Sequence, residues 1–528
     1  MKQGGQEGQA VLDQGCSWSD LIAGVESISR LPEGLTPGPR VTGVEYDSRR
    51  VVSGSVFIAM RGGTTDGNRY VEAAIGQGAA GIITDSPEAF ARLGENHPAM
   101  PRLLVEHGRI ALAQASAVFF ANPERQLSAT GVTGTNGKTT TAFLMEALLA
   151  AAGRSSVLVG TIEYHVAGVV RPSAHTTPES RDLFALMSEG VERGASELVM
   201  EVSSHALEQG RVAGVGFDVA VFTNLTRDHL DFHGTMQNYF AAKRLLFDGT
   251  RYAAPRVAVL HAGDSHAKEL ARVASAAGSA VVTYGLVEGA DWRATGVQLT
   301  PSGAEFRLHS PEGEADLRSG LAGEVNVLNL LGAMAAARAR GVSFAALLRA
   351  VPGLMPVPGR FQHVDAGQPF TVIVDYAHTD DALRNLTALA RQLLANVQGT
   401  PGQSGGRVIT MFGCGGDRDR TKRPRMGQAA GEGSDLVIVT SDNPRSEDQD
   451  AIIQEILPGL RATNAGFEVE PSRAAAIELA LENAKPGDVV LLAGKGHEKE
   501  QILRDGPVFF DDAQVALSAL HRLGYGGE

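Results

Sequence analysis

The sequence has few cysteines and no long apolar run. Its two cysteines, Cys16 and Cys414, lie far apart in the chain, which excludes a disulfide framework and a cysteine-rich zinc site. We expect both to be inert thiols in a protein of the reducing cytoplasm. No stretch of about 18 uninterrupted apolar residues occurs, so no segment is expected to span a bilayer.

The chain also lacks an excess of positive charge. It has 47 lysines and arginines against 60 acidic residues, a formal net charge of −13, which argues against nucleic acid or an anionic membrane as its main partner. A hydrophobic content of 43% and a charged content of 20% are typical of a globular protein. No repeat of solenoid period occurs. The polar, glycine- and glutamine-rich start of the chain, residues 1–15, is predicted to be a disordered tail.

The length of 528 residues favours about three to four domains. From residue 128 onward, apolar strands alternate with helical patterns, which is typical of a parallel sheet with crossover helices. The strands are predicted at 155–160, 197–202, 217–222, 256–260 and 280–284, and the helices at 181–193, 236–247, 266–277 and 325–338.

A proline-punctuated stretch, 351–359, interrupts this alternation and is predicted to be a linker. The alternation then restarts, with strands predicted at 370–375, 407–412, 435–440 and 488–493 and a surface loop at 396–406. Before residue 128 lies a third region with strand-like segments at 55–60 and 81–84. The sequence therefore predicts an α/β protein of three domains, 1–125, 126–357 and 358–528, the last of them Rossmann-like.

The segment 128–141 is predicted to bind the phosphates of a nucleotide. A short β-branched run passes through three glycines, at 131, 134 and 137, into Lys138 and Thr139 and then into an apolar helix. Such a loop turns backbone N–H groups towards an anion, while the lysine reaches the phosphates and the threonine hydroxyl holds Mg²⁺. The usual spacing has glycine where this chain has Val132. The alternative is a plain tight connection between strand and helix.

Polar residues at the strand ends are the candidates for catalysis, because ligands of open α/β sheets bind beyond the carboxyl ends of the strands. Glu201 ends an apolar strand and is either a Mg²⁺ ligand or a salt-bridged carboxylate. His229, flanked by Asp228 and Asp231, is either a metal ligand or a surface histidine. Lys243, among apolar residues of a helix, looks by itself like a lysine whose stem packs on the surface.

The C-terminal region carries charged residues of both signs after its predicted strands. Arg418 and Arg445 present planar guanidinium groups that suit carboxylates, while Asp442 and Glu498 suit an ammonium group. Together they favour a zwitterionic ligand. The alternative is that residues 442–445 form a proline-containing turn closed by a local ion pair.

Four motifs in order, 134–140, 200–205, 223–231 and 242–247, resemble those of the Mur ligases, ATP-dependent peptide synthetases of the bacterial cell wall. The resemblance runs from about residue 40 to the C-terminus. It implies an N-terminal domain that binds a uridine nucleotide, a central ATPase domain and a C-terminal domain that binds the incoming amino acid.

The resemblance also implies roles for individual residues. Lys243 would be carbamylated and would bind Mg²⁺ together with Thr139, Glu201 and His229, while His205 or His378 assists proton transfer. Residues expected to bind ATP are Gly134, Thr135, Asn136, Gly137, Lys138, Thr139, Thr140, Asn326, Asn329, Arg360 and Asp375. Residues expected to hold the UDP-muramoyl-peptide are Ser48, His175, Thr176, Thr177, Ser203, Gln209 and Arg211. Residues expected to bind the amino acid are Arg418, Asp442, Asn443, Pro444, Arg445, Gly494 and Glu498.

Two positions depart from the family pattern. His175 stands where relatives usually have asparagine, which affects one predicted hydrogen bond to substrate. Asp380 stands where they usually have proline, which is expected to alter only the start of a helix.

The reaction implied by the resemblance joins meso-diaminopimelate to the γ-carboxylate of D-glutamate in UDP-N-acetylmuramoyl-L-Ala-D-Glu, through an acyl phosphate made from ATP. The arginine at 445 favours diaminopimelate, because lysine and ornithine, the alternative substrates, lack its distal carboxylate. More distant alternatives are a ligase like folylpolyglutamate synthetase and a regulatory P-loop ATPase. We expect a cytoplasmic monomer that binds small molecules and Mg²⁺, with no nucleic acid partner and no membrane insertion.

Overall fold

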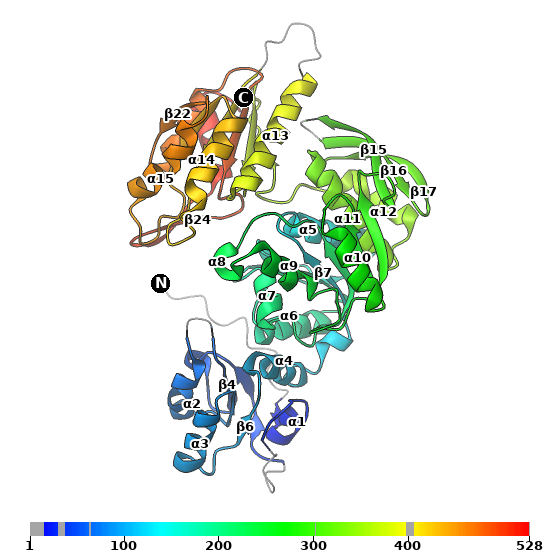
Figure 1. Ribbon diagram of the computed structural model, residues 1–528, viewed down its shortest axis with the longest axis vertical. Coiled ribbons are helices and arrows are strands. Elements are labelled where there is room, and N and C mark those ends of the chain that lie inside the picture. Colours follow the sequence, from blue (N-terminus) through cyan, green and yellow to red (C-terminus); the bar gives the residue numbers. More distant parts are fainter. Residues whose placement is uncertain (1–14, 30–36, 63–64, 301–302, 398–405, 527–528) are drawn as a thin grey trace.

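The computed structural model describes residues 15–29, 37–62, 65–300, 303–397 and 406–526, and it shows three α/β units arranged one after another along the long axis of the molecule (Figure 1). Each unit is built on its own sheet. The predicted α/β fold with three units is therefore confirmed. The predicted N-terminal tail lies outside the described residues. No helix in the described ranges is long and apolar enough to cross a membrane.

The N-terminal unit has a four-stranded parallel sheet in the order β3-β4-β5-β6. The predicted strands at 55–60 and 81–84 are β4 and β5. The strands are β3 (Gly43–Glu45), β4 (Ser55–Ala59), β5 (Gly81–Thr84) and β6 (Arg102–Leu104), the helices are α1 (Trp18–Ala23), α2 (Val71–Gly76), α3 (Pro87–Asn96) and α4 (Gly108–Phe119), and β1 (Cys16–Ser17) pairs with β2 (Arg40–Val41).

The central unit has an eleven-stranded sheet in the order β10-β9-β8-β11-β7-β12-β13-β14-β15-β16-β17. Its strands are β7 (Ser128–Thr133), β8 (Ser156–Val159), β9 (Glu163–Val166), β10 (Val169–Pro172), β11 (Glu197–Glu201), β12 (Phe217–Phe222), β13 (Val257–His261), β14 (Ala280–Gly285), β15 (Trp292–Thr300), β16 (Gly303–Ser310) and β17 (Gly313–Ser319). Its helices are α5 (Lys138–Ala151), α6 (Ser180–Glu192), α7 (Ser204–Gln209), α8 (Leu230–His233), α9 (Met236–Arg244), α10 (Ala267–Ala276), α11 (Glu324–Ala339) and α12 (Phe344–Ala350).

The neighbouring strands β8, β11, β7, β12, β13 and β14 run parallel, as predicted, because their apolar runs are buried between two hydrophobic cores. The antiparallel pairs at the two edges, β9–β10 and β15–β17, were not predicted. The order β11-β7-β12 places the carboxyl ends of three strands side by side. Glu201 on β11 lies opposite Val132 on β7, next to the predicted phosphate loop.

The C-terminal unit has a six-stranded sheet in the order β18-β19-β23-β20-β21-β22. Its strands are β18 (Gln362–His363), β19 (Thr371–Asp375), β20 (Val408–Phe412), β21 (Leu436–Val439), β22 (Gly466–Val469) and β23 (Val489–Ala493), and a separate hairpin joins β24 (Glu500–Leu503) to β25 (Gly506–Phe509). Its helices are α13 (Asp380–Val397), α14 (Lys422–Gly433), α15 (Gln449–Arg461), α16 (Arg473–Glu482) and α17 (Asp512–Arg522).

Two boundaries of this unit bear on the predictions. Helix α13 begins at Asp380, the residue that stands where relatives usually have proline. The Thr379 hydroxyl caps this helix start by accepting a hydrogen bond from the backbone N–H of Ala382, so the aspartate is accommodated there. Helix α13 continues to Val397, so the surface loop predicted at 396–406 begins too early: residues 396–397 are helical, and 398–405 lie outside the described residues.

Candidate active site

The glycines of the phosphate loop are required by the close approach of other residues. Gly134 has a φ of +151° and Gly137 a φ of +86°. A Cβ on Gly134 would lie 1.9 Å from the Thr223 hydroxyl oxygen, and one on Gly137 would lie 2.4 Å from the Asn329 side-chain oxygen. Val132 instead belongs to the buried strand β7, where no turn is needed. The spacing that departs from the usual pattern is therefore compatible with the loop.

Two lysines meet at one backbone carbonyl of this loop. Lys138 donates to the carbonyl oxygens of Gly134 and Thr135 at 3.1 and 2.9 Å, and Lys243 donates to the same Gly134 oxygen at 2.7 Å. Burial lowers the pKa of both amines, and the positive charge of Lys138 lowers the pKa of Lys243 further. Lys243 is almost fully buried, so it is not the surface lysine that its sequence context suggests.

Glu201 is fully buried at the end of β11, where hydrogen-bond donors surround its carboxylate. It accepts hydrogen bonds from the Thr139 hydroxyl at 3.0 Å and from the backbone N–H and hydroxyl of Thr161 at 2.7 and 3.0 Å. The Thr139 oxygen also accepts a hydrogen bond from Arg360 at 3.1 Å, across from the C-terminal unit. The charge of Glu201 also acts on the Lys138 amine and raises its pKa, against the larger effect of burial.

The histidines near α8 form a cluster of rings. The ring of His205 lies 4.8 Å from that of His229 and 5.4 Å from that of His233, measured between centroids. Burial lowers the pKa of His229 to about 4, although Asp228 lies 3.4 Å away, and the positive charges of Lys138 and Lys243 contribute. His229 is therefore neutral at pH 7, the form in which an imidazole binds a metal.

The donor atoms of the residues at this site are of the kind that bind a magnesium ion. The adjacent oxygens of Thr139 and Glu201 are the hard ligands that Mg²⁺ prefers. The described residues contain no group of three or more His, Cys, Asp and Glu side chains placed to hold a metal. Protein ligands of a metal here would therefore have to include other residue types, such as the Thr139 hydroxyl.

A cavity of about 420 Å³ lies against the phosphate loop and extends to the C-terminal unit. Among the residues predicted to bind ATP, those that line it are Thr135, Asn136, Gly137, Lys138, Thr139, Thr140, Asn326, Asn329, Arg360 and Asp375. Asp375 is held by the backbone N–H groups of Phe361 and Ala377, at 2.7 and 2.9 Å, and burial raises its pKa.

A second cavity, of about 500 Å³, adjoins the first, and both are lined by Asp228, His229, Tyr376 and His378. Of the residues predicted to bind the amino acid, Arg418, Asp442, Asn443, Arg445, Gly494 and Glu498 line the second cavity, together with His205. Pro444, between Asn443 and Arg445, is not among the residues that line it.

Of the three arginines that line this cavity, Arg418 and Arg445 form no salt bridge with a carboxylate among the described residues. Arg418 donates to the carbonyl oxygen of Asp417 at 3.1 Å, and Arg445 donates to that of Gly416 at 2.8 Å. Burial and the charge of Arg418 lower the pKa of Arg445. The ion pair between Asp442 and Arg445 that the plain-turn alternative requires is not formed, since the salt-bridge partner of Asp442 is Lys495.

Lys495, which sequence reasoning missed, is a fully buried cation beneath this cavity. Its amine lies 2.9 Å from the side-chain oxygen of Asn443, 3.1 Å from Glu498 and 3.7 Å from Asp442. Asn443 also donates to Glu498 at 2.9 Å, so its side chain is used within the protein. Asp442 Oδ1 is buried, accepts no hydrogen bond and faces the Lys495 amine at 3.7 Å. The only sequence signal for Lys495 is its place between Gly494 and Gly496.

Tyr376, which sequence reasoning also missed, connects the two cavities. Its ring lies 4.6 Å from the guanidinium carbon of Arg360 on the ATP side, and its hydroxyl interacts with Glu498 on the other side. A second contact between the units joins Asn136 of the phosphate loop to Asp381 of α13 at 3.2 Å. The ends of β7 and β19 are therefore linked directly.

Most of the residues predicted to hold the muramoyl-peptide lie together near the end of β11. Thr177 donates to the Glu201 carbonyl at 2.8 Å and accepts from the Ser203 N–H at 3.1 Å, while Arg211 donates to the Thr177 carbonyl at 3.0 Å. The other members contact this group: Gln209 accepts from Arg211, and the Thr176 hydroxyl lies 3.0 Å from that of Thr161.

The remaining two residues predicted to hold this substrate are His175, which directly precedes Thr176, and Ser48 of the N-terminal unit. His175 is exposed, and its backbone is held by Tyr164. Ser48 begins a short 3₁₀ helix between Tyr46 and Arg50, which both contact Asp182 of the central unit at 2.7 and 3.2 Å. Ser48 is therefore at the junction of the first two units.

Models of three sequence families match the chain in order. "Mur ligase family, catalytic domain" matches residues 40–120, "Mur ligase middle domain" matches 132–337, and "Mur ligase, glutamate ligase domain" matches 359–496. These matches fall on the three units of the structure.

Curated relatives match over almost the whole chain. The UDP-N-acetylmuramoyl-L-alanyl-D-glutamate–2,6-diaminopimelate ligases of Solibacter usitatus and Geobacter metallireducens are 47% and 44% identical, over 94% and 92% of this chain and 97% and 96% of theirs. A solved structure of a ligase with the same name is 31% identical, with a TM-score of 0.67, and covers 97% of this chain and 100% of its own. A folylpolyglutamate synthase of Mycobacterium tuberculosis, 17% identical with a TM-score of 0.58 over 80% of this chain and 95% of its own, shares the fold.

Proposed function

The chain belongs to the Mur ligase family of ATP-dependent amide ligases, and we propose that it joins meso-diaminopimelate to UDP-N-acetylmuramoyl-L-alanyl-D-glutamate. The new amide would link an amine of diaminopimelate to the γ-carboxylate of the D-glutamyl residue. The product is a precursor of peptidoglycan.

The observation that carries the choice of amino acid is the charge of the second cavity. Arg418 and Arg445 have no carboxylate partner among the described residues, while Asp442 Oδ1 accepts no hydrogen bond. Diaminopimelate has two carboxylates and two ammonium groups, whereas lysine and ornithine have a single carboxylate. Two guanidinium groups without a carboxylate partner, in a cavity that also presents Asp442 and Glu498, therefore favour diaminopimelate.

In the first step the γ-carboxylate attacks the terminal phosphorus of ATP, forming an acyl phosphate and ADP, because a carboxylate does not accept an amine without activation. Lys138 would place its ammonium on the phosphates, where developing charge is stabilised by preorganised donors. Its two hydrogen bonds to loop carbonyls hold the amine beside the cavity before ATP binds. Arg360, fixed over the ring of Tyr376, brings a second positive charge from the C-terminal unit.

Lys243 is proposed to carry a carbamate, formed when its neutral amine adds to CO₂ with release of a proton. Its buried position and its shared acceptor with Lys138 support this, since a carbamate replaces repulsion between two cations with attraction. The carbamate, Glu201, Thr139 and His229 would then hold Mg²⁺, which supplies positive charge to the phosphates when bound. A ¹³C resonance from ¹³CO₂ that is present in the wild type and absent from Lys243→Ala would test the modification.

In the second step the amine of diaminopimelate attacks the acyl carbon, and inorganic phosphate leaves. The amine must be neutral to attack, so its proton needs an acceptor. His378 suits this role better than His205, because its Nδ1 lies 2.9 Å from the Tyr376 carbonyl oxygen and donates to it, which leaves Nε2 as a free acceptor at the boundary of the two cavities. Burial lowers the pKa of His378, which keeps the ring neutral.

The proposal is tested by competition between amino acids. The purified enzyme is incubated with ATP, the UDP-muramoyl-dipeptide and an equimolar mixture of diaminopimelate, lysine and ornithine. The mass of the product is then determined by mass spectrometry. We expect the diaminopimelate adduct. A dominant lysine or ornithine adduct would contradict the assignment of Arg445, and phosphate release without dipeptide or amino acid would favour a regulatory ATPase.

The enzyme is further proposed to act as a monomer in the cytoplasm, with no nucleic acid partner. The net charge of −13 and the two free thiols, Cys16 and Cys414, support this. Light scattering of the purified protein measures its mass in solution, and a dimer would overturn the proposed state.

A further inference from the structure

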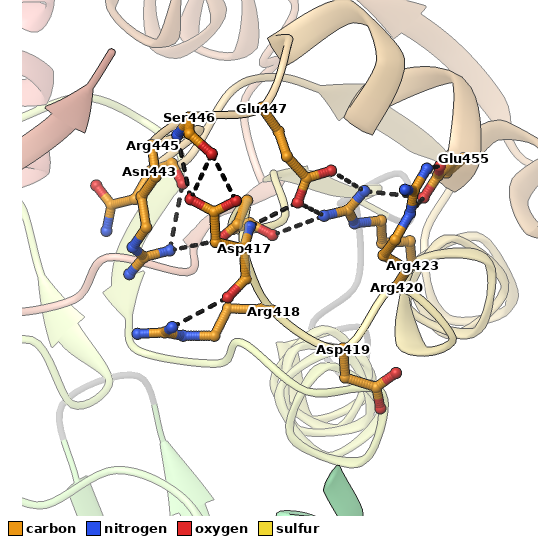
Figure 2. A network of polar contacts seen from close by, with 12 residues as sticks. Asp417, Arg418, Asp419, Arg420, Arg423, Asn443, Arg445, Ser446, Glu447 and Glu455 are labelled. Carbon is orange, nitrogen blue, oxygen red and sulfur yellow. Dashed lines mark hydrogen bonds and ion pairs between the residues drawn. The ribbon is translucent and has the colours of Figure 1, made fainter. Parts of the chain in front are cut away.

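Arg445 stands on a loop that is held in an unusual backbone conformation. The loop after β21, residues 440–448, lies against the loop after the neighbouring strand β20, residues 413–421 (Figure 2). Arg445 has a φ of +53° and Asp417, on the other loop, a φ of +52°. Side chains other than glycine rarely adopt this left-handed region, so both residues need support from their surroundings.

The carboxylate of Asp417 ties the two loops together. Its oxygens accept hydrogen bonds from the Ser446 hydroxyl at 2.8 and 2.9 Å and from the Ser446 N–H at 3.2 Å. In return, Arg445 donates to the carbonyl oxygen of Gly416 at 2.8 Å. Figure 2 shows these contacts next to one another, with the arginine on one side of Asp417 and Ser446 above it.

Glu447 connects the two loops to helices α14 and α15. It accepts the N–H of Asp417 at 2.5 Å and pairs through both oxygens with Arg423 of α14, at 2.8 and 3.0 Å. The side chain of Arg423 is 1% exposed, and it also pairs with Glu455 of α15 at 2.8 Å. A buried guanidinium with two carboxylates is a fixed anchor, because it holds each acid by charged hydrogen bonds that would be lost if that acid moved away.

The opposite side of the loop is held by the β24–β25 hairpin. The Arg445 N–H donates to the Ile502 carbonyl at 3.0 Å, and the Ile502 N–H donates to the Asn443 side chain at 2.9 Å. The backbone of Arg445 is thus fixed on one side and its guanidinium on the other. Its remaining N–H groups are left for a ligand in the cavity.

We propose that Asp417, Ser446 and Glu447, anchored on Arg423, are positioning residues that aim Arg445 at the distal carboxylate of the amino-acid substrate and so set its specificity. This inference rests on the proposed function. None of the four touches the reacting atoms, and each acts through Arg445. A guanidinium held in place loses little side-chain entropy when it binds a carboxylate, so loosening the loop weakens binding of diaminopimelate and spares lysine.

Two glutamates on the same anchor give a matched pair of variants. Glu447→Gln and Glu455→Gln each remove one acid from Arg423, but Glu447 also accepts the N–H of Asp417, whereas Glu455 reaches the loops only through Arg420. We expect Glu447→Gln to raise the KM for diaminopimelate about tenfold, with kcat and the KM for ATP changed by less than about threefold. Glu455→Gln is expected to leave the KM for diaminopimelate within about twofold of the wild type.

Ser446 provides a second test that does not depend on a buried ion pair, because it is exposed. Ser446→Ala should raise the KM for diaminopimelate, Ser446→Thr should restore it by keeping the hydroxyl, and kcat/KM for lysine should stay unchanged in both. If Glu447→Gln does not fold, the two Ser446 variants alone test the inference.

Unchanged KM values in Ser446→Ala and Glu447→Gln, or equal increases in Glu447→Gln and Glu455→Gln, would overturn the inference and leave the proposed function standing. A wild-type enzyme that does not ligate diaminopimelate would overturn both.

Discussion

Replacement of Arg445 by glutamine tests how the enzyme selects its amino acid. The substitution removes the positive charge that faces the second cavity and keeps a shorter polar side chain with an N–H donor. Both residues carry a Cβ, so the cost of the φ of +53° is the same before and after the change. The perturbation is therefore confined to the guanidinium.

The size of the effect follows from the contacts of Arg445. Its hydrogen-bond partners are backbone carbonyls, and its pKa is lowered by burial although Asp442, Glu498 and Asp417 act on it through their charge. A substrate carboxylate would therefore give it a charged hydrogen-bond acceptor. A hydrogen bond to a charged group contributes about 1.5–3 kcal/mol. Since about 1.4 kcal/mol is a factor of ten, kcat/KM for diaminopimelate should fall about 10- to 150-fold.

The assay measures kcat/KM for diaminopimelate and for lysine by phosphate release, with thermal unfolding as a control for the fold. Lysine has no distal carboxylate, so its kcat/KM should change by less than about threefold. Equal losses for the two amino acids in a folded variant would refute the reasoning, because the guanidinium would then not recognise the second carboxylate.

Three further changes have expected outcomes. Lys138→Ala should abolish measurable turnover and keep the wild-type circular dichroism, and appreciable activity would contradict its role at the phosphates. Asp512→Ala leaves the fully buried Arg473 without its partner at 2.6 Å and should lower the unfolding free energy by about 3–5 kcal/mol in urea denaturation; an unchanged midpoint would count against that pair. His165 lies between two glutamates that raise its pKa to about 9, against 6.5 ordinarily, so its stabilising effect is complete below pH 6.5 and is lost as the pH rises through 9. The difference in Tm between wild type and His165→Gln should therefore be largest near pH 6 and vanish above pH 9, and a difference that grows with pH would be the contrary result.

The fold was predictable where one local pattern determines the structure. Strands such as β12 and β23 are buried on both faces, so their sequences are continuous apolar runs, and the glycines at 134 and 137 mark the turn into α5. The hairpin β9–β10 and strands β15–β17 were missed because they lie at the edges of the sheet, where exposed polar residues interrupt the apolar pattern.

The site was predictable in its residue types and less so in its contacts. The motifs indicated the oxygen donors Thr139 and Glu201, which do lie together. Nothing local distinguishes the buried Lys495 from an exposed lysine, because its partner Asn443 is 52 residues away in the chain. For the same reason the sequence did not show that Asn443, predicted as a ligand of the substrate, contacts Lys495 and Glu498 through its side chain.

The central claim is that the γ-carboxylate of the acceptor is phosphorylated before the amide forms. The most direct measurement uses UDP-muramoyl-dipeptide with ¹⁸O in that carboxylate and follows the label in the released phosphate by mass spectrometry. The account predicts one labelled oxygen transferred to phosphate per turnover, since the acyl carbon loses the oxygen that bridges it to phosphorus. Phosphate free of ¹⁸O, alongside normal formation of the amide, would contradict the acyl phosphate and the mechanism built on it.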